Sequence, residues 1–365
     1  EMSASLVGSE MCIRDRHYGA FIIEAKGAIE GAELIGETVS DYTITAGDVK
    51  LDIADLEKKY DAVLEPIFKN SLPEMPRPVS VAYDKGCDLL TNKAPGTIAK
   101  PKVLIPVFPG TNCEYDMAAA FNRYGGEAEI FVIRNLSAKN MEDSVNEFAK
   151  RIENSQMIAV PGGFSGGDEP EGSAKFINAF FRNPKIKDAV ENMLYARDGL
   201  MIGICNGFQA LIKLGLVPFG KIVPLSSESP TLTYNTIGRH QSQLALTKIC
   251  TNKSPWLMHC KVGEVYNIPI SHGEGRFVAS DEVIAKLIEN GQIATQYVDL
   301  NGEPTMALAY NPNSSMCAIE GIISPDGRVL GKMGHTERIS SDTCVNVDGN
   351  KEQLLFKGGV DYFRI

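Results

Sequence analysis

From Val103 onward, short apolar runs alternate with longer segments whose apolar residues recur at helical spacing. The apolar runs are KVLIPVF, EAEIFVI, QMIAVPGG and GLMIGIC, and amphipathic segments such as MEDSVNEFAKRI and FQALIKLG follow them. Nearly continuous apolar strands separated by helices are typical of a parallel sheet that is covered on both faces. The sequence therefore predicts a doubly wound α/β domain with a mostly parallel sheet, and we expect its active site at the carboxyl edge of the strands.

Glycines stand where this pattern changes from one element to the next. Gly125 and Gly215 occupy positions where helices should end, whereas Gly110 and Gly162 follow apolar strands at the turns toward the next helix. From about residue 221 to residue 365 the chain contains short strand-like runs, and the sequence does not determine the order in which they pair.

The part of the chain before this pattern divides into three segments. Residues 1–16 show neither strand nor helix periodicity, and we interpret them as a foreign leader or a mistaken translation start. Residues 17–92 contain strand-like runs and the amphipathic segment DIADLEKKYDAVLEPIFKN, which together predict an α+β fragment too small to stand alone. The Pro, Gly and Lys content of TNKAPGTIAKPK predicts a linker over residues 93–102, before a domain at 103–365.

Composition narrows the class of partner. With 44% hydrophobic and 22% charged residues, the 365-residue chain is typical of a globular protein. Its formal net charge of −10 gives no reason to expect nucleic acid or an anionic membrane surface, which favours a small molecule or another protein. No apolar run reaches the roughly 18 residues of a membrane helix and no secretory signal is evident, so we expect a cytoplasmic protein.

Eight cysteines are scattered along the chain without the short paired spacings of a disulfide framework or a zinc site. We therefore expect reduced thiols and no metal site. In a reducing compartment any one of these thiols is available as a nucleophile.

The strongest chemical signal is the segment LMIGICNGFQALIKLG, in which an apolar strand runs directly into a helix at Cys205. A nucleophile at such a turn has a strained backbone, and small residues two positions before and after it let the strand and the helix approach closely. Gly203 and Gly207 meet that requirement. The first amides of the helix favour the thiolate, so the sequence predicts that Cys205 is catalytic rather than an ordinary core cysteine.

A thiol nucleophile needs a base, and five histidines are present. In GKMGHTERI, Glu337 lies two residues after His335, so in an extended segment, which the β-branched Thr336 favours, both side chains share one face. The carboxylate is then able to orient the imidazole. His272 in ISHGEGRF has Glu274 at the same spacing, and the sequence alone separates the two histidines poorly.

The loop AVPGGFSGGDEPEG follows an apolar strand and carries four glycines, but it lacks the ending of a phosphate-binding loop, and its acidic residues disfavour phosphate. We interpret Gly162 and Gly163 as oxyanion-hole or substrate-backbone contacts beside Cys205, with a plain surface turn as the alternative. In the similar loop FPGTNCE we expect a structural role, with Cys113 as an ordinary buried thiol.

Five motifs, FPGTNCE, VPGGFSGGD, GICNGFQ, SHGEGRF and GHTER, follow one another in this order. Together they resemble the glutaminase domain of the phosphoribosylformylglycinamidine synthase family, and the resemblance covers residues 103–365. It implies a class I glutamine amidotransferase with a flavodoxin-like fold. The earlier segment, from HYGAFIIEA through LEPIFKN, resembles the tail of the synthetase part of these enzymes. That part is similar to aminoimidazole ribonucleotide synthetase and precedes the glutaminase in single-chain forms. The resemblance therefore implies that the chain is a truncated enzyme.

The resemblance also implies an activity. Glutamine is hydrolysed through a glutamyl thioester on Cys205, and ammonia passes to the synthetase, which is missing here or lies on another chain. There ATP, with Mg²⁺, drives amidation of formylglycinamide ribonucleotide in purine biosynthesis. The glutaminase itself implies no cofactor.

Site residues follow from the same resemblance. His335 serves as general base and acid and Glu337 as its partner, while the amides of Gly163 and Asn206 stabilise the oxyanion. Gln209 lies near the bound glutamine, and Gly162 and Phe164 complete the predicted binding residues.

The sequence departs from the commoner family pattern at two positions: Thr336 replaces a proline, and Gly166 replaces an aromatic residue. Loss of the proline removes a constraint that favours extended backbone at His335. Two other functions remain open at this point, namely another cysteine hydrolase of similar fold, and a glutaminase module that is silent without its synthetase.

Overall fold

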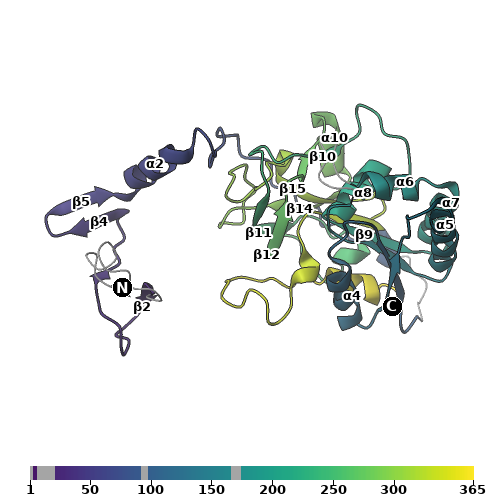
Figure 1. Cartoon of the computed structure of the whole chain (residues 1–365), viewed down its shortest axis with the longest axis horizontal. Coiled ribbons are helices and arrows are strands. Elements are labelled where there is room, and N and C mark those ends of the chain that lie inside the picture. Colours follow the sequence, from purple (N-terminus) through teal and green to yellow (C-terminus); the bar gives the residue numbers. More distant parts are fainter. Residues whose placement is uncertain (1–2, 6–20, 92–97, 166–173) are drawn as a thin grey trace. The chain divides into compact units, whose positions relative to one another are not determined.

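A nine-stranded mixed sheet forms the centre of the larger of two compact units in the computed structural model (Figure 1). The structure describes residues 3–5, 21–91, 98–165 and 174–365. The smaller unit is Glu1–Ser71 and the larger is Leu72–Ile365. Most of the predicted leader and residues 93–97 of the predicted linker lie outside the described residues.

The strand order of the central sheet is β12-β11-β14-β15-β16-β9-β8-β6-β7. Strands β7, β6, β8, β9 and β16 pair in parallel, whereas β16, β15, β14, β11 and β12 pair antiparallel. The strands are β6 (Lys102–Val107), β7 (Glu127–Val132), β8 (Met157–Val160), β9 (Leu200–Ile204), β11 (Gln241–Ile249), β12 (Val265–His272), β14 (Ile293–Tyr297), β15 (Ile319–Ile323) and β16 (Val329–Lys332).

Helices form two groups around this sheet. Helices α5, α7, α6 and α8 contact one another in sequence, and α4 contacts α11, with the two groups on opposite sides of β9 in Figure 1. The predicted α/β fold is confirmed. The helices are α4 (Glu114–Arg123), α5 (Ala138–Glu153), α6 (Lys175–Phe181), α7 (Pro184–Glu191), α8 (Asn206–Leu214), α9 (Leu216–Phe219), α10 (Asp281–Glu289) and α11 (Leu355–Asp361).

Local chemistry explains where several of these helices begin and end. The hydroxyls of Ser137 and Ser280 accept hydrogen bonds from backbone amides in the first turns of α5 and α10. Gly215 ends α8 in the left-handed conformation, and Gly125 follows α4 at φ 82°, as predicted for both. No helix in the described ranges combines the length and the apolar character needed to cross a bilayer.

The strands whose order the sequence left open form the antiparallel half of the sheet. Along β12, half-buried and buried side chains alternate strictly, as expected for a strand with one face on the core. A further pair, β10 (Thr231–Thr233) and β13 (Arg276–Val278), forms a separate two-stranded sheet. These connections arise from side-chain packing across elements far apart in sequence, which explains why local patterns did not reveal them.

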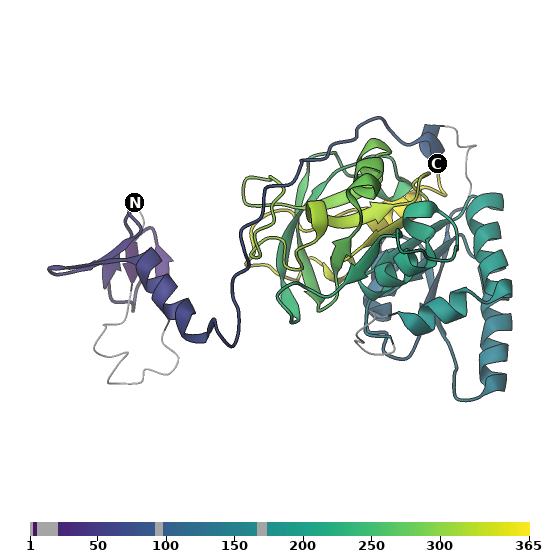
Figure 2. The same ribbon diagram turned by 90° about the horizontal axis from the view of Figure 1, so that it is seen from above.

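Residues 72–91 belong to the larger unit and lie upstream of the linker predicted at 93–102. Figure 2 shows this segment in dark blue running across the larger unit to α3 (Asp88–Thr91). The amide of Val81, which is buried, donates to Gln296 Oε1 at 2.9 Å, and the amide of Tyr83 donates to the Cys250 carbonyl at 2.8 Å. Backbone hydrogen bonds therefore attach this segment to the central sheet.

The smaller unit contains short antiparallel strands and one helix. Its elements are β1 (Ser3–Ser5), β2 (Ile23–Ala25), β3 (Gly36–Glu37), β4 (Thr43–Ala46), β5 (Val49–Asp52) and α2 (Ile53–Leu64). β1 lies within residues 1–16, where we predicted no regular structure, and it pairs with β2 and β3. None of the side chains described between residues 21 and 71 is buried, and apolar side chains on and after α2 are exposed, including Tyr60 and Ile67.

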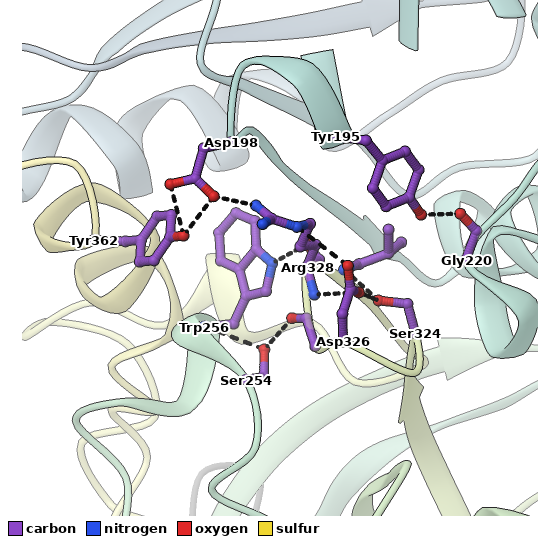
Figure 3. Close-up of polar contacts among 11 residues, drawn as sticks. Tyr195, Asp198, Gly220, Ser254, Trp256, Ser324, Asp326, Arg328 and Tyr362 are labelled. Atoms are coloured by element: carbon purple, nitrogen blue, oxygen red, sulfur yellow. Dashed lines mark hydrogen bonds and ion pairs between the residues drawn. The ribbon is translucent and has the colours of Figure 1, made fainter. Parts of the chain in front are cut away.

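A polar cluster ties the C-terminal helix to the amino ends of β9 and β16 (Figure 3). The Tyr362 hydroxyl lies 2.8 and 2.9 Å from the two carboxylate oxygens of Asp198, which also pairs with Arg328. Arg328 Nε lies 3.1 Å from Asp326 Oδ2. The main-chain carbonyl of Arg328 accepts a hydrogen bond from the Trp256 indole at 3.0 Å. These contacts link four segments distant in sequence at the edge of the sheet opposite Cys205.

Candidate active site

Cys205 occupies the turn between β9 and α8, with φ 53° and ψ −107°. Such a conformation is costly for a residue with a side chain, by about 1–3 kcal/mol. Hydrogen bonds hold it in place, because its amide donates to the Lys332 carbonyl at 2.8 Å and its carbonyl accepts from the Gln209 amide at 3.0 Å. A Cβ on Gly203 would lie 2.6 Å from the carbonyl carbon of Gly207, so the predicted need for small residues at the elbow is confirmed.

His335 follows β16, the strand that pairs in parallel with β9. Its amide donates to the Pro269 carbonyl at 2.8 Å, and its Nδ1 lies 2.6 Å from Glu337 Oε1. Both side chains are buried, at 1% and 3% exposure for the residues. The imidazole and the carboxylate therefore form the pair that the sequence motif predicted.

The backbone that produces this pair differs from the prediction. Thr336–Arg338 form a 3₁₀ turn, so the expectation of an extended segment was wrong. The Arg338 amide donates to the His335 carbonyl at 3.2 Å, and the Thr336 hydroxyl is fixed by buried neighbours rather than by strand pairing. His335 itself precedes the turn with φ −87° and ψ 71°, and its side chain still reaches that of Glu337.

Gly162 lies between the two reacting groups. A Cβ at this position would lie 2.7 Å from His335 Cε1 and 3.4 Å from the Cys205 Cβ. Any larger residue would therefore collide with the imidazole. Gly162 is close to Cys205, as predicted, and its carbonyl also accepts hydrogen bonds from the amides of Asn112 and Cys113 at 3.1 and 3.3 Å.

The electrostatics of His335 favour the imidazolium. Burial opposes its protonation, but the negative charge of Glu337, followed by that of Cys205, outweighs burial and holds the pKa of His335 well above its ordinary value. Among the described residues, Nε2 makes no hydrogen bond, and this nitrogen is the one left over when Glu337 binds Nδ1. The arrangement suits a thiolate beside an imidazolium.

His272, the alternative base, ends β12 in the same region and is 2% exposed. Neither of its ring nitrogens has a hydrogen-bond partner within the described residues, so Glu274 does not orient it. Burial, reinforced by the charges of His335 and His240, lowers the pKa of His272 to about 3. The geometry thus favours His335 over His272.

A buried polar network lies behind His335. Lys332 Nζ lies 3.4 Å from Glu320 Oε1 and donates to the Thr336 hydroxyl and the Gly334 carbonyl, each at 3.0 Å. The Thr336 hydroxyl donates in turn to Gln353 Oε1 at 2.9 Å. Lys332 and Glu320 are 1% and 0% exposed, so the pair is fully desolvated. Thr336 supplies a hydroxyl that the proline commoner at this position lacks, and the network uses it.

The predicted substrate residues on α8 connect two loops. Asn206 Oδ1 accepts from the Ser165 hydroxyl at 2.6 Å, its Nδ2 donates to Gln209 Oε1 at 2.9 Å, and Gln209 Nε2 donates to the Glu274 carbonyl. Asn206 and Gln209 are 1% and 5% exposed. The glycine-rich loop, α8 and the loop after β12 are thus joined beside the elbow.

The glycine-rich loop itself runs antiparallel to the FPGTNCE loop. Gly163 forms a bridge with Thr111, and the amide of Phe164 donates to the Gly110 carbonyl at 2.7 Å. The Phe164 ring, 36% exposed, lies 6.2 Å from that of His240. Gly166 and the acidic residues of this loop fall outside the described residues.

Cys113 lies beside His335, a position that we did not predict for it. It is fully buried, its Sγ lies 3.8 Å from His335 Nδ1, and it accepts a hydrogen bond from Arg338 Nη2 at 3.0 Å. Only the shared turn character of FPGTNCE and VPGGFSGGD pointed to it, because nothing in a single sequence shows that these two loops pair.

Residues 100–363 match the family model of the CobB/CobQ-like glutamine amidotransferase domain. The chain belongs to this family of glutamine amidotransferases. It is 34% identical over 262 residues to phosphoribosylformylglycinamidine synthase subunit PurQ from Chlorobium chlorochromatii, which covers 69% of this chain and 93% of that subunit. With PurQ from Aquifex aeolicus it shares 33% identity over 249 residues, 68% of this chain and 95% of the relative.

Among solved structures, PurLQS from Thermotoga maritima has a chain that is 26% identical, with a TM-score of 0.51, and the match covers 72% of this chain and 99% of that chain. Within the amidotransferases, this chain therefore belongs with the PurQ subunits of phosphoribosylformylglycinamidine synthase. The resemblance drawn from the five motifs is confirmed.

Proposed function

We propose that this chain hydrolyses glutamine through a glutamyl thioester on Cys205, with His335 as general base and acid and Glu337 as its orienting partner. The observation that supports this most directly is the buried convergence of the three side chains around Gly162. They come from the ends of two parallel neighbouring strands, which is where an open α/β sheet places its active site.

The residues divide the reaction in the following way. His335 Nε2 accepts the proton of the Cys205 thiol, and the sulfur attacks the side-chain amide carbon of glutamine. Glu337, bound to Nδ1, fixes the tautomer that leaves a lone pair on Nε2 and stabilises the imidazolium. His335 then protonates the departing nitrogen, so ammonia leaves and the acyl group stays on sulfur. Water, activated by His335, hydrolyses the thioester to glutamate and the free thiol.

The negative oxygen of each tetrahedral intermediate needs preorganised donors. We assign this role to the amides of Gly163 and Asn206, because one lies in the loop beside Gly162 and the other is the first residue of α8. Gly162, Phe164 and Gln209 complete the proposed glutamine site. Gln209 acts from a fixed position, since its side chain is bonded to Asn206 and to the Glu274 carbonyl.

Ammonia released here would serve a synthetase that amidates formylglycinamide ribonucleotide, with ATP and Mg²⁺ bound by that synthetase rather than by this chain. The support is membership of the PurQ group, whose members are named as subunits of phosphoribosylformylglycinamidine synthase. The solved relative likewise comes from an assembly named PurLQS.

We also propose that residues 17–92 come from the tail of a synthetase part. The absence of any buried side chain among residues 21–71 supports this origin, because a fragment without a core needs a surface to pack against. Increased hydrogen-exchange protection of α2 on addition of the synthetase would agree with it. Unchanged exchange in an active complex would contradict it.

The experiment that tests the glutaminase is labelling with a diazo-ketone analogue of glutamine, followed by intact mass and peptide mapping. We expect one adduct, on Cys205, that excess glutamine prevents. Cys205→Ala removes it, whereas Cys260→Ala, which changes a buried thiol elsewhere, retains it. An adduct on a different cysteine would overturn the assignment.

The same labelling separates an autonomous glutaminase from one that needs its synthetase. Labelling of the chain alone shows a preformed site. Labelling only after addition of the synthetase subunits would show that the site is completed by its partner, and no labelling in either state would contradict the proposed function.

A further inference from the structure

The proposed glutaminase mechanism makes no use of Cys113, although this thiol borders the reacting groups. Cys113 immediately precedes α4, is fully buried, and lies on the Nδ1 side of His335. Its Sγ would be 3.1 Å from a Cβ on Gly162, the same position that lies next to His335 and Cys205. A buried thiol beside an imidazole and a carboxylate is a set of groups that is able to bind a metal ion.

Cys113, His335 and Glu337 place one sulfur, one nitrogen and one oxygen within 4.8 Å of one another. These three donor types are the ones that Zn²⁺ selects in proteins. Tetrahedral coordination at ordinary bond lengths requires about 3.5 Å between sulfur and nitrogen and about 3.3 Å between nitrogen and oxygen. The observed separation of Sγ and Nδ1, 3.8 Å, is close to the first requirement, and that of Nδ1 and Oε1, 2.6 Å, has to open by less than an ångström.

A second observation points to a ligand at this position. Glu337 Oε2 is buried and has no hydrogen-bond partner within the described residues. Buried carboxylate oxygens are normally satisfied, so this oxygen is available to a cation or to a water bound to it. Flexible side chains make the required opening of the His335–Glu337 pair feasible without movement of the sheet.

Charge selects the kind of cation. A thiolate and a carboxylate together balance the charge of a divalent ion, and the Arg338 guanidinium donates to the Cys113 sulfur at 3.0 Å. Mg²⁺ and Ca²⁺ require several oxygen ligands, and here only one carboxylate is present among the three donors. The site therefore fits a thiophilic divalent ion.

We infer that Cys113, His335 and Glu337 form an inhibitory Zn²⁺ site in which the metal occupies the Nδ1 side of the proposed catalytic base. The metal replaces the proton of the Cys113 thiol and takes the lone pair of Nδ1. From an imidazolium, the Nδ1 proton also leaves to solvent; from a neutral ring, that proton moves to Nε2. In both cases the ring carries the metal on Nδ1 and its one proton on Nε2, so Nε2 has no lone pair with which to activate the water that hydrolyses the thioester.

The inhibition rests on the proposed roles of Cys205 and His335, whereas metal binding does not, and two measurements keep them apart. The first is titration of the full chain carrying Cys205→Ser with Co²⁺, an optical substitute for Zn²⁺. We expect a thiolate-to-metal absorption band that Zn²⁺ displaces. Adding Cys113→Ser should abolish the band, and adding Cys260→Ser in its place should leave it unchanged. A band that survives loss of Cys113 would overturn the site.

The second measurement is glutamine hydrolysis at buffered free Zn²⁺, with the synthetase subunits present if activity requires them. We expect reversible loss of turnover, relieved by a chelator, and a half-inhibiting Zn²⁺ concentration at least about tenfold higher in Cys113→Ser, because one of three protein ligands is lost. Equal sensitivity of the wild type and Cys113→Ser would overturn the inference by showing that Zn²⁺ acts elsewhere, for example on Cys205. If glutamine is not hydrolysed at all, the proposed function fails, and the Co²⁺ titration still decides the metal site.

Discussion

Strands β9 and β16 run parallel side by side, and their two ends differ in how polar groups are satisfied. At the amino ends, Asp198 pairs with Arg328 and accepts a hydrogen bond from the Tyr362 hydroxyl, and the main chain has positive φ at Asp198 and Gly327. At the carboxyl ends, Cys205 is strained and His335 Nε2 makes no hydrogen bond among the described residues. One pair of strands thus carries a satisfied cluster at one edge and an unsatisfied one at the other.

The difference separates stability from activity. Paired groups at the amino edge gain nothing from a ligand, because their hydrogen bonds are already made. Unpaired and strained groups at the carboxyl edge cost stability, and they retain the lone pairs and the reactive thiol that a substrate needs. Substitutions at the two edges should therefore have opposite signatures, and the following predictions test this.

The largest effect is expected at the carboxyl edge. Cys205→Ala and His335→Ala should each lower glutamine turnover by about 10⁴-fold or more, the scale of a lost triad member. The free energy of unfolding should fall little in Cys205→Ala, which removes one sulfur atom from a strained position, and more in His335→Ala, which leaves Glu337 buried without its partner. Steady-state kinetics and urea unfolding of the same preparations measure both. Wild-type turnover in either variant would show that the carboxyl ends of β9 and β16 do not carry the activity.

The buried pair behind His335 should affect both properties. Lys332→Met leaves Glu320 buried without its cation, which costs about 3–5 kcal/mol of stability. It also removes the donor to Thr336 and Gly334, so we expect kcat to fall more than KM changes. The double variant Lys332→Met/Glu320→Leu is the control, because it removes the unpaired charge.

In that double variant, the free energy of unfolding should recover while kcat stays low. This result would show that the buried network around Lys332 positions His335. Recovery of both would mean that the single variant acted only through partial unfolding.

The sequence predicted the parallel half of the fold because its signals are local. Strands β8 and β9 are uninterrupted apolar runs and β6 nearly so, and Gly125 and Gly215 mark helix ends by conformations that other residues rarely adopt. The antiparallel half was not predictable in the same way. The order β14-β15-β16 depends on cross-strand packing, and a local pattern contains no record of it.

The candidate site shows the same limit. Cys205, His335 and Glu337 lie in short motifs whose spacing indicates their chemistry, so the sequence alone was enough to predict a catalytic role for them. Cys113 reaches His335 only because two distant loops pair through Gly163 and Thr111. The polar cluster of Figure 3 combines residues from several segments that are distant in sequence, and no local sequence pattern indicates that they meet.

At the amino edge, Arg328→Met should destabilise without inactivating. The substitution removes the cation from Asp198 and Asp326, and Asp198 is partly exposed, so we expect a loss of about 2 kcal/mol. Under conditions where the variant is fully folded, turnover per folded molecule should match the wild type. A large fall in kcat would show that the two ends of β9 and β16 are coupled.

The free energy of unfolding should depend on pH through the buried, unpaired imidazole of His272. His272 has a folded pKa lowered to about 3, against about 6.5 in the unfolded chain, so between these values only the unfolded state binds the proton. Its contribution to stability is complete above about pH 6.5 and is lost as pH falls, with a slope near 1.4 kcal/mol per pH unit. The raised pKa of His335 acts at higher pH, where its contribution is lost as pH rises.

Urea unfolding between about pH 6.5 and pH 4.5 measures this slope. His272→Gln cannot titrate and should show a shallower acid slope by up to the same amount. An unchanged slope would mean that carboxylates alone account for acid sensitivity.

The smallest expected effect is also the most specific to the amino edge. Tyr362→Phe removes one hydroxyl, which lies 2.8 Å from Asp198, and leaves the aromatic packing of α11 intact. Since Asp198 keeps its contact with Arg328, the loss should be about 1 kcal/mol, the net value of one hydrogen bond. Tyr115→Phe, at a side chain that is 75% exposed, serves as the control and should change nothing. If Tyr362→Phe lowered turnover while Tyr115→Phe did not, the C-terminal helix would influence the site through β9 and β16, and the division between the two edges would not hold.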